Sequence, residues 1–244
     1  MRWVDKNSLS EHLKEASSIL EKINDYNDDV RIRDIIRDIY SGCCAYCGSS
    51  PESASYFQIE HFYPKNSMYG FDKYEKDIKN LHYSCQRCNA LKREIPHPNL
   101  FSPNFYLIKG EWVHSNPDKF KRELIYVGHL LYSRDIKNVD RGQYSIDLFD
   151  LNNLNGSGRS NRSYLVEARI KVYDEVFQLL NLLYTLLEKT FRSKEITQIE
   201  KEILDILFIR LIKYMSPDAA YSNMVIDNFG ESLLELLGVF SKIK

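Results

Sequence analysis

The most constraining feature of this sequence is a pair of Cys-x-x-Cys motifs, Cys44–Cys47 and Cys85–Cys88, with 37 residues between them. Each motif presents two thiolates from one tight turn, and four thiolates complete a closed tetrahedral zinc site of the structural type. All five cysteines lie in this one segment, a distribution typical of metal ligands and not of a disulfide framework. We therefore predict one structural Zn²⁺ held by Cys44, Cys47, Cys85 and Cys88, with Cys43 as a small buried hydrophobic residue.

The overall charge excludes one class of nucleic-acid binder. The chain carries 33 Lys and Arg against 34 Asp and Glu, so it is not a polycation held to nucleic acid by bulk charge, although a local basic patch remains compatible with this balance. No stretch approaches the ~18 uninterrupted apolar residues of a membrane helix, and the N-terminus lacks the apolar core of a signal peptide. The sequence predicts a cytoplasmic protein with no membrane partner.

Hydrophobic periodicity divides the chain into four segments around the cysteines. We expect N-terminal helices in 1–42, a zinc-stapled unit in 43–98, an irregular connecting region with short strands in 99–160, and a helical region in 161–244. The predicted fold class is α+β, with the metal-stapled unit embedded between helices.

Capping and turn signals locate several elements within these segments. Asp28 or Asp29 is expected to cap a helix that ends at Gly42, and Ser216-Pro217 to open the last helix as N-cap and first helical residue. Short strands are expected at 125–127 and 144–146.

A second group of polar residues lies between and beside the cysteine pairs. The first stretch reads Ile59-Glu60-His61-Phe62-Tyr63-Pro64-Lys65, and the second runs from Lys79-Asn80-Leu81-His82 through Cys88-Asn89 to Lys92. This arrangement resembles that of HNH endonucleases, the ββα-metal nucleases whose zinc-stapled members carry two Cys-x-x-Cys pairs around the active site. The resemblance covers residues 43–95. It implies that Asn80 is the middle residue of the motif and braces the loop that orients His61.

Phosphodiester hydrolysis gives roles to the other polar residues. His61 is suited to act as general base because an imidazole is partly neutral near pH 7. A carboxylate at Glu60 can coordinate Mg²⁺; it lies on the opposite face from His61 in a regular strand, or is re-aimed by a bulge. Asn89, at the start of a helix expected over 89–94, is the second candidate ligand, and His82 is its substitute. Many HNH enzymes have a histidine where this chain has Asn89, and its loss favours Mg²⁺ or Mn²⁺ over Zn²⁺ or Ni²⁺ as catalytic metal.

The basic residues nearest these motifs are candidates for substrate contact. Lys65, Lys92 and Arg93 are expected either to touch phosphates or to be solvated surface charges. No segment of the chain is strongly cationic, so strong autonomous binding to duplex DNA is not expected.

A second, looser resemblance predicts a partner protein for this chain. The stretch from Ser145 to Asn152, followed by Arg159 or Arg162, resembles a subgroup commonly encoded beside an ATPase in bacterial anti-phage defence systems of the Septu type. It implies a companion ATPase that recruits and licenses the nuclease through helices outside 43–95. The C-terminal segment carries wide apolar faces that either pack within the chain or serve this contact: Ile196, Ile199, Ile203, Ile206, Leu207 and Leu211.

Three functions follow from the sequence. The preferred one is a metal-dependent endonuclease acting on DNA. RNA, such as a tRNA, is the alternative substrate, because single-metal hydrolysis does not require a 2′-hydroxyl. The non-enzymatic alternative is a zinc-stapled binding or scaffold module.

Overall fold

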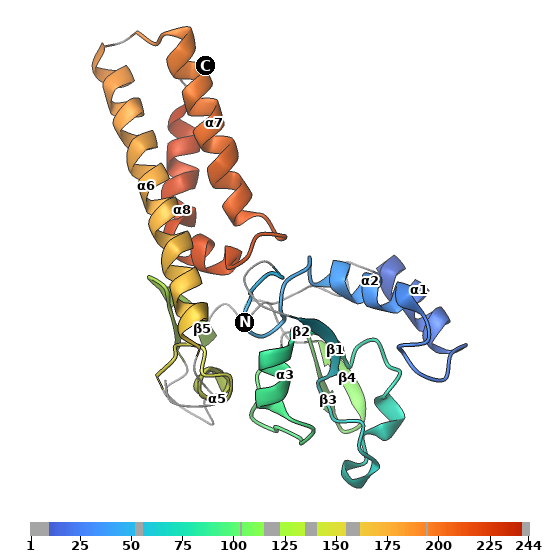
Figure 1. Ribbon diagram of the computed structural model, residues 1–244. Helices are drawn as coiled ribbons and strands as arrows, with labels where there is room; N and C mark the ends of the chain where they lie inside the picture. The colour runs from blue at the N-terminus through green and yellow to red at the C-terminus, as the bar shows by residue number, and fades with distance from the viewer. Residues whose placement is uncertain are drawn as a thin grey trace.

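The computed structural model describes residues 10–51, 56–102, 104–114, 123–134, 141–154, 162–193 and 195–240. Its helices are α1 (Ser10–Leu20), α2 (Val30–Ile39), α3 (Gln86–Lys92), α5 (Arg141–Leu148), α6 (Ser163–Ser193), α7 (Gln198–Met215) and α8 (Ser222–Phe240). Its strands are β1 (Phe57–His61), β2 (Leu81–Cys85), β3 (Phe105–Ile108), β4 (Glu111–His114), β5 (Leu124–Val127) and β6 (Leu130–Ser133). The mixture of helices and short strands confirms the predicted α+β class (Figure 1).

The central unit is a hairpin-like pair of strands followed by a helix. β1 and β2 are antiparallel, with Glu60 opposite His82 and His61 opposite Leu81, and β2 leads directly into α3. Every residue of β2 is buried, because α2 packs on this pair and α3 contacts both strands. The strand pair thus places the Cys85–Cys88 motif at one end and the polar residues Glu60 and His61 at the other, where Lys92 at the end of α3 reaches them.

The N-terminal helices lie against this unit and confirm one predicted cap. The Asp29 carboxylate accepts a hydrogen bond from the backbone N–H of Arg31 at the start of α2. α2 is amphipathic and buries four isoleucines, Ile32, Ile35, Ile36 and Ile39. α1 packs on α2, and Tyr26 in the turn between them contacts His61 at the end of β1.

The connecting region contains two further antiparallel pairs, β3 with β4 and β5 with β6. The strand predicted at 125–127 is confirmed as part of β5. The strand predicted at 144–146 is wrong, because these residues lie in α5, where the Ser145 hydroxyl donates to the Arg141 carbonyl one turn earlier, 2.7 Å away. Ser145 also accepts the backbone N–H of Phe101, so tertiary contacts decide the conformation of a segment without strong periodicity.

The C-terminal helices α6, α7 and α8 form an elongated bundle that projects from the central unit (Figure 1). The predicted start of the last helix is wrong. Ser216 caps the C-terminus of α7, and the chain then makes tight turns until Tyr221, whose φ of +60° interrupts the helical path before α8 begins at Ser222. Tyr221 also donates its backbone N–H to the Gly48 carbonyl, which ties this turn to the first Cys-x-x-Cys loop. Among the described residues, no helix is long and apolar enough to cross a bilayer.

Candidate active site and metal centre

Four thiols meet where the loop after α2 faces the junction of β2 and α3. The Sγ atoms of Cys44, Cys47, Cys85 and Cys88 all lie within 4.8 Å of one another, and all four residues are buried. The Cys47 and Cys85 sulfurs are 3.8 Å apart. Tetrahedral Zn²⁺ with Zn–S bonds of about 2.3 Å requires S–S edges of about 3.8 Å. The donor set and its spacing therefore fit a structural zinc ion. Cys43 is also buried but stands outside this cluster, with its sulfur 3.8 Å from the Asp218 carbonyl.

A buried arginine lies against this thiol cluster. Two guanidinium nitrogens of Arg162 lie 3.5 and 3.6 Å from Cys88 Sγ, and one of them also donates to the Phe149 carbonyl, 3.1 Å away. Arg162 is completely inaccessible to solvent. Burial alone would lower its pKa, but the negative charge of Cys88 and Cys47 raises it above its ordinary value, so the side chain stays charged. Four thiolates with Zn²⁺ carry two net negative charges, and Arg162 offsets one of them. Arg159, the alternative arginine of the sequence motif, lies outside the described residues.

The imidazole of His61 is held in one tautomer at the end of β1. Its Nε2 lies 2.9 Å from the Glu75 carbonyl oxygen, which can only accept, so Nε2 carries the proton and Nδ1 is left as the acceptor. Burial lowers the pKa of His61 below its ordinary value, so the ring is neutral at pH 7. A neutral imidazole with an unprotonated Nδ1 has the chemistry of a general base.

Asn80 joins the two ends of the loop that contains Glu75. Its Oδ1 accepts the backbone N–H of Tyr63 at 2.8 Å, and its Nδ2 donates to the carbonyls of Tyr63 and Tyr74 at 3.0 and 3.1 Å. The side chain is completely buried. Asn80 therefore fixes the loop whose Glu75 carbonyl orients His61.

Glu60 lies on the face of β1 opposite His61, in a regular ladder and not at a bulge. It is 3% exposed. One carboxylate oxygen accepts from the Tyr46 hydroxyl, and the other lies 3.0 Å from Lys92 Nζ. Carboxylate oxygen is a suitable ligand for Mg²⁺ or Mn²⁺, but here it already has a cationic neighbour. A metal ion at Glu60 requires Lys92 to give up this contact.

Lys92 occupies a different environment from the one expected of a phosphate contact. Its ammonium donates to the His61 carbonyl at 2.6 Å as well as pairing with Glu60, and the residue is 2% exposed. In this conformation the ammonium is directed at protein groups and not at solvent. Lys92 thereby connects the end of α3 to both residues of the Glu60-His61 pair.

The remaining polar candidates lie around this core. Asn89 is half-buried in the middle of α3, which begins three residues earlier than expected, and lies one helical turn before Lys92 on the same side of the helix. His82 is buried opposite Glu60, with Nδ1 3.2 Å from the Tyr46 hydroxyl. Arg93 is exposed just after α3.

Lys65 and Tyr26 form the edge of the site next to His61. Lys65 Nζ lies 3.4 Å from a Glu75 carboxylate oxygen and 5.6 Å from the centroid of the Tyr26 ring. Tyr26, from the turn between α1 and α2, meets the His61 ring edge-on with 5.2 Å between centroids. Tyr26 is not predictable from the sequence, because nothing in its local pattern connects that turn to β1.

Comparisons with known proteins agree with this geometry. A model of the HNH endonuclease family matches residues 44–94, the segment that contains the four clustered thiols, Glu60, His61 and α3. The chain is also 26% identical over 246 aligned positions to Septu protein PtuB of Bacillus mycoides (strain KBAB4), an alignment that covers 88% of this chain and 79% of that protein. The predicted HNH resemblance is confirmed. Residues 44–94 are an HNH endonuclease domain, and the protein that carries it is a nuclease, a hydrolase of the phosphodiester bonds of nucleic acid.

Proposed function

We propose that this chain is the DNA-cleaving effector of an anti-phage defence system in which a companion ATPase recruits and licenses the nuclease. The observation that carries the catalytic part is the His61 ring, which is neutral, fixed in the Nε2–H tautomer by Glu75 and placed at one end of the β1–β2 pair, whose other end carries Cys85 of the four-thiol cluster. The defence role is supported by the likeness to a Septu protein along most of the chain.

The reaction uses His61 as the base. Nδ1 takes a proton from water as the water attacks the phosphorus, and the P–O bond on the opposite side breaks, so that the leaving oxygen departs and is protonated from solvent. The Nε2–H bond to the Glu75 carbonyl stabilises the imidazolium that forms. Asn80 keeps the loop in place, so the base does not drift from its working position. Glu60 and Asn89 would hold one Mg²⁺ or Mn²⁺, which supplies charge for the scissile phosphate and the leaving oxygen. Lys65 and Arg93, both at the solvent boundary, would touch phosphates of the substrate.

Cleavage by the His61→Ala variant tests this proposal. Purified parent protein, with and without its companion, is incubated with plasmid DNA, single-stranded DNA and total RNA in Mg²⁺ or Mn²⁺. We expect His61→Ala to lose about 10²-fold or more of the cleavage rate, because general-base catalysis contributes about 10²–10⁴-fold. Zinc content and circular dichroism should not change, since His61 is not one of the clustered thiols.

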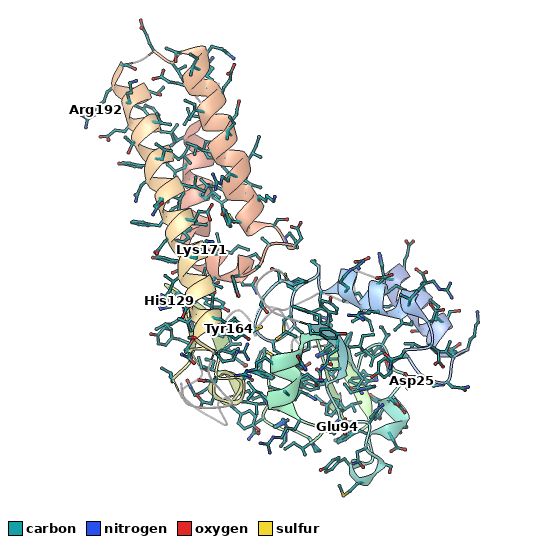
Figure 2. The ribbon with its side chains drawn as sticks, in the orientation of Figure 1. Asp25, Glu94, His129, Tyr164, Lys171 and Arg192 are labelled. Atoms are coloured by element: carbon teal, nitrogen blue, oxygen red, sulfur yellow. The ribbon has the colours of Figure 1, made fainter. Side chains whose placement is uncertain are left out.

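The matched control is His129→Ala, which removes an imidazole from the turn between β5 and β6. Figure 2 shows His129 on the side of the molecule where α6 begins, away from the central unit. Equal cleavage by the parent and by His61→Ala would reject His61 as the base, and full activity in excess chelator would reject the catalytic metal. Cleavage of RNA but not DNA would replace DNA by the alternative substrate. A protein that cuts nothing under any of these conditions would favour the scaffold alternative.

A further inference from the structure

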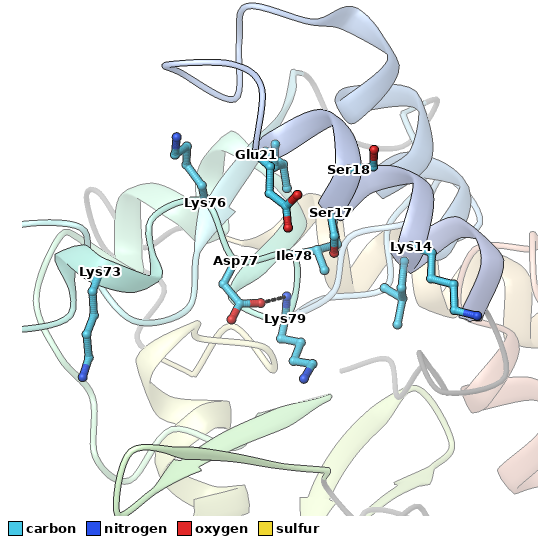
Figure 3. Close-up of a pocket in the computed structure, with 11 residues that line it drawn as sticks. Lys14, Ser17, Ser18, Glu21, Lys73, Lys76, Asp77, Ile78 and Lys79 are labelled. Atoms are coloured by element: carbon cyan, nitrogen blue, oxygen red, sulfur yellow. Dashed lines mark hydrogen bonds between the residues drawn. The ribbon is translucent and has the colours of Figure 1, made fainter.

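A lysine-lined cavity lies beside the active site and is not part of it. Its volume is about 830 Å³, and it is bounded by α1 on one side and by the segment that precedes β2 on the other (Figure 3). Its charged and hydroxyl-bearing lining residues are Lys14, Ser17, Ser18, Glu21, Lys73, Lys76, Asp77 and Lys79. Four lysines and two carboxylates therefore line the cavity, in a chain whose formal net charge is −1.

One of the two carboxylates is already engaged by hydrogen-bond donors. Asp77 Oδ2 accepts the indole N–H of Trp112 at 2.6 Å, and its Oδ1 accepts the backbone N–H of Lys79 at 2.9 Å. These bonds use Asp77 to fix the segment. Glu21 is the second acidic residue, so the four lysines still leave the lining with an excess of positive charge.

The lysine-bearing segment is the same segment that orients the catalytic base. Lys73, Lys76 and Lys79 flank Glu75, whose carbonyl accepts from His61 Nε2 at 2.9 Å. Lys76 Nζ also donates to the Ile23 carbonyl at 2.9 Å, which joins this segment to the end of α1. The cavity lining and the hydrogen-bond partner of the base therefore belong to one pinned segment of backbone.

From this arrangement we infer that the cavity binds the phosphodiester backbone of the nucleic-acid substrate, next to the phosphate that is cleaved. The inference rests on the proposed nuclease function and adds the surface that holds the substrate. Lysine ammoniums neutralise phosphates without reading bases, so the contact is independent of sequence. Lys73 lies two residues from Glu75. The surface proposed to bind the nucleic-acid backbone therefore adjoins the residue whose carbonyl orients His61.

The test is a binding measurement with a double substitution, Lys14→Gln together with Lys73→Gln. Both side chains are exposed, so their loss should leave the fold and the zinc content unchanged. Binding of a fluorescent oligonucleotide of about 20 nucleotides is followed by anisotropy in a His61→Ala background, which keeps the probe intact, with DNA and RNA probes run side by side. We expect at least about a 10-fold loss of affinity near 0.1 M salt, and a salt dependence shallower by about 1.5 in log–log slope, since each lost phosphate contact removes about 0.7–0.9.

Two matched variants complete the design. Lys171→Gln with Lys213→Gln removes the same charge from exposed positions on the helical bundle, where Figure 2 shows Lys171 well away from the central unit, and should bind as the parent does. Lys14→Arg with Lys73→Arg keeps the charge and should restore binding. Parental affinity and slope in the Gln pair would overturn the inference while leaving the nuclease function intact. A parent chain that neither binds nor cuts nucleic acid would overturn the proposed function, and the inference with it.

Discussion

At the scale of single residues, Arg162 links the four-thiol cluster to the C-terminal helices. It lies one residue before α6, yet its guanidinium reaches Cys88, which is 74 positions earlier in the chain. Hydrogen bonds from a buried cation to a thiolate favour the deprotonated sulfur that binds zinc. Partners of this kind, one step removed from the metal, typically change metal affinity by about 10–100-fold.

Replacing Arg162 with Met should therefore weaken zinc retention. We expect zinc to be lost to a competing chromogenic chelator about 10-fold faster or more, because the thiolates lose their buried counter-charge. Arg162→Lys should fall between the parent and Arg162→Met, since an ammonium keeps the charge but not the two-nitrogen geometry.

Arg169→Met is the control for this experiment. Arg169 is as deeply buried, but its guanidinium donates to the carbonyls of Leu151 and His129 and not to sulfur. Its loss should destabilise the fold without changing the zinc release rate of molecules that remain folded. If Arg162→Met and Arg169→Met release zinc at the same rate, Arg162 has no specific role at the metal.

At the scale of elements, α3 connects two parts of the candidate site within seven residues. Its first turn supplies Cys88 to the thiol cluster, and its last residue, Lys92, pairs with Glu60. The sequence was sufficient to predict this element because cysteine spacing and motif order are local signals. It was not sufficient to predict that Lys92 turns inward, since that depends on how α3 packs against β1.

Other elements show the same contrast between contacts that are local in sequence and contacts that are distant. The Asp29 cap was predictable because it involves residues two positions apart. The start of α8 was not, because the Tyr221 backbone bonds to Gly48, far away in sequence. The four-segment division and the roles of Asn80, Asn89 and Glu60 stay predictions that require the experiments described.

The Lys92–Glu60 pair offers a direct test of metal binding at Glu60. Lys92→Met leaves a buried carboxylate without its cation, which should lower the free energy of unfolding by about 3–5 kcal/mol. If Mg²⁺ binds Glu60, millimolar Mg²⁺ should restore part of this loss, raising the thermal unfolding midpoint of Lys92→Met more than that of the parent.

The double variant Lys92→Met with Glu60→Gln is the matched control, because it removes both charges. Its unfolding midpoint should not respond to Mg²⁺. Equal responses of all three proteins to Mg²⁺ would show that the ion does not bind at Glu60, and the catalytic metal would then need other ligands.

At the scale of the whole molecule, the bundle presents an apolar surface away from the nuclease domain. The apolar residues of α7 were expected either to pack within the chain or to contact a partner. The structure divides them: Leu207 and Leu211 are buried in the bundle, whereas Ile199, Ile203 and Ile206 are exposed. The exposed stripe of α7 consists of five isoleucines, Ile199, Ile203, Ile206, Ile209 and Ile212. Several large exposed isoleucines on one helix are typical of a protein interaction site.

We propose that this isoleucine stripe is where the companion ATPase binds, because contact there leaves the HNH domain open to nucleic acid. Ile206, at the middle of the stripe, is 63% exposed, so Ile206→Asp should fold normally and yet lose the partner. The measurement is affinity co-purification of the nuclease with the products of its neighbouring genes, with Ile108→Asp on β3 as control, since Ile108 is 52% exposed but lies outside the bundle. We expect the control to retain the ATPase, and Ile206→Asp to co-purify with at least about 10-fold less of it, because a charge at the centre of an apolar contact is left desolvated.

Retention of the ATPase by Ile206→Asp would show that the contact lies elsewhere on the chain. A parent chain that purifies alone, is fully active and ignores its neighbour would show that no licensing partner is needed.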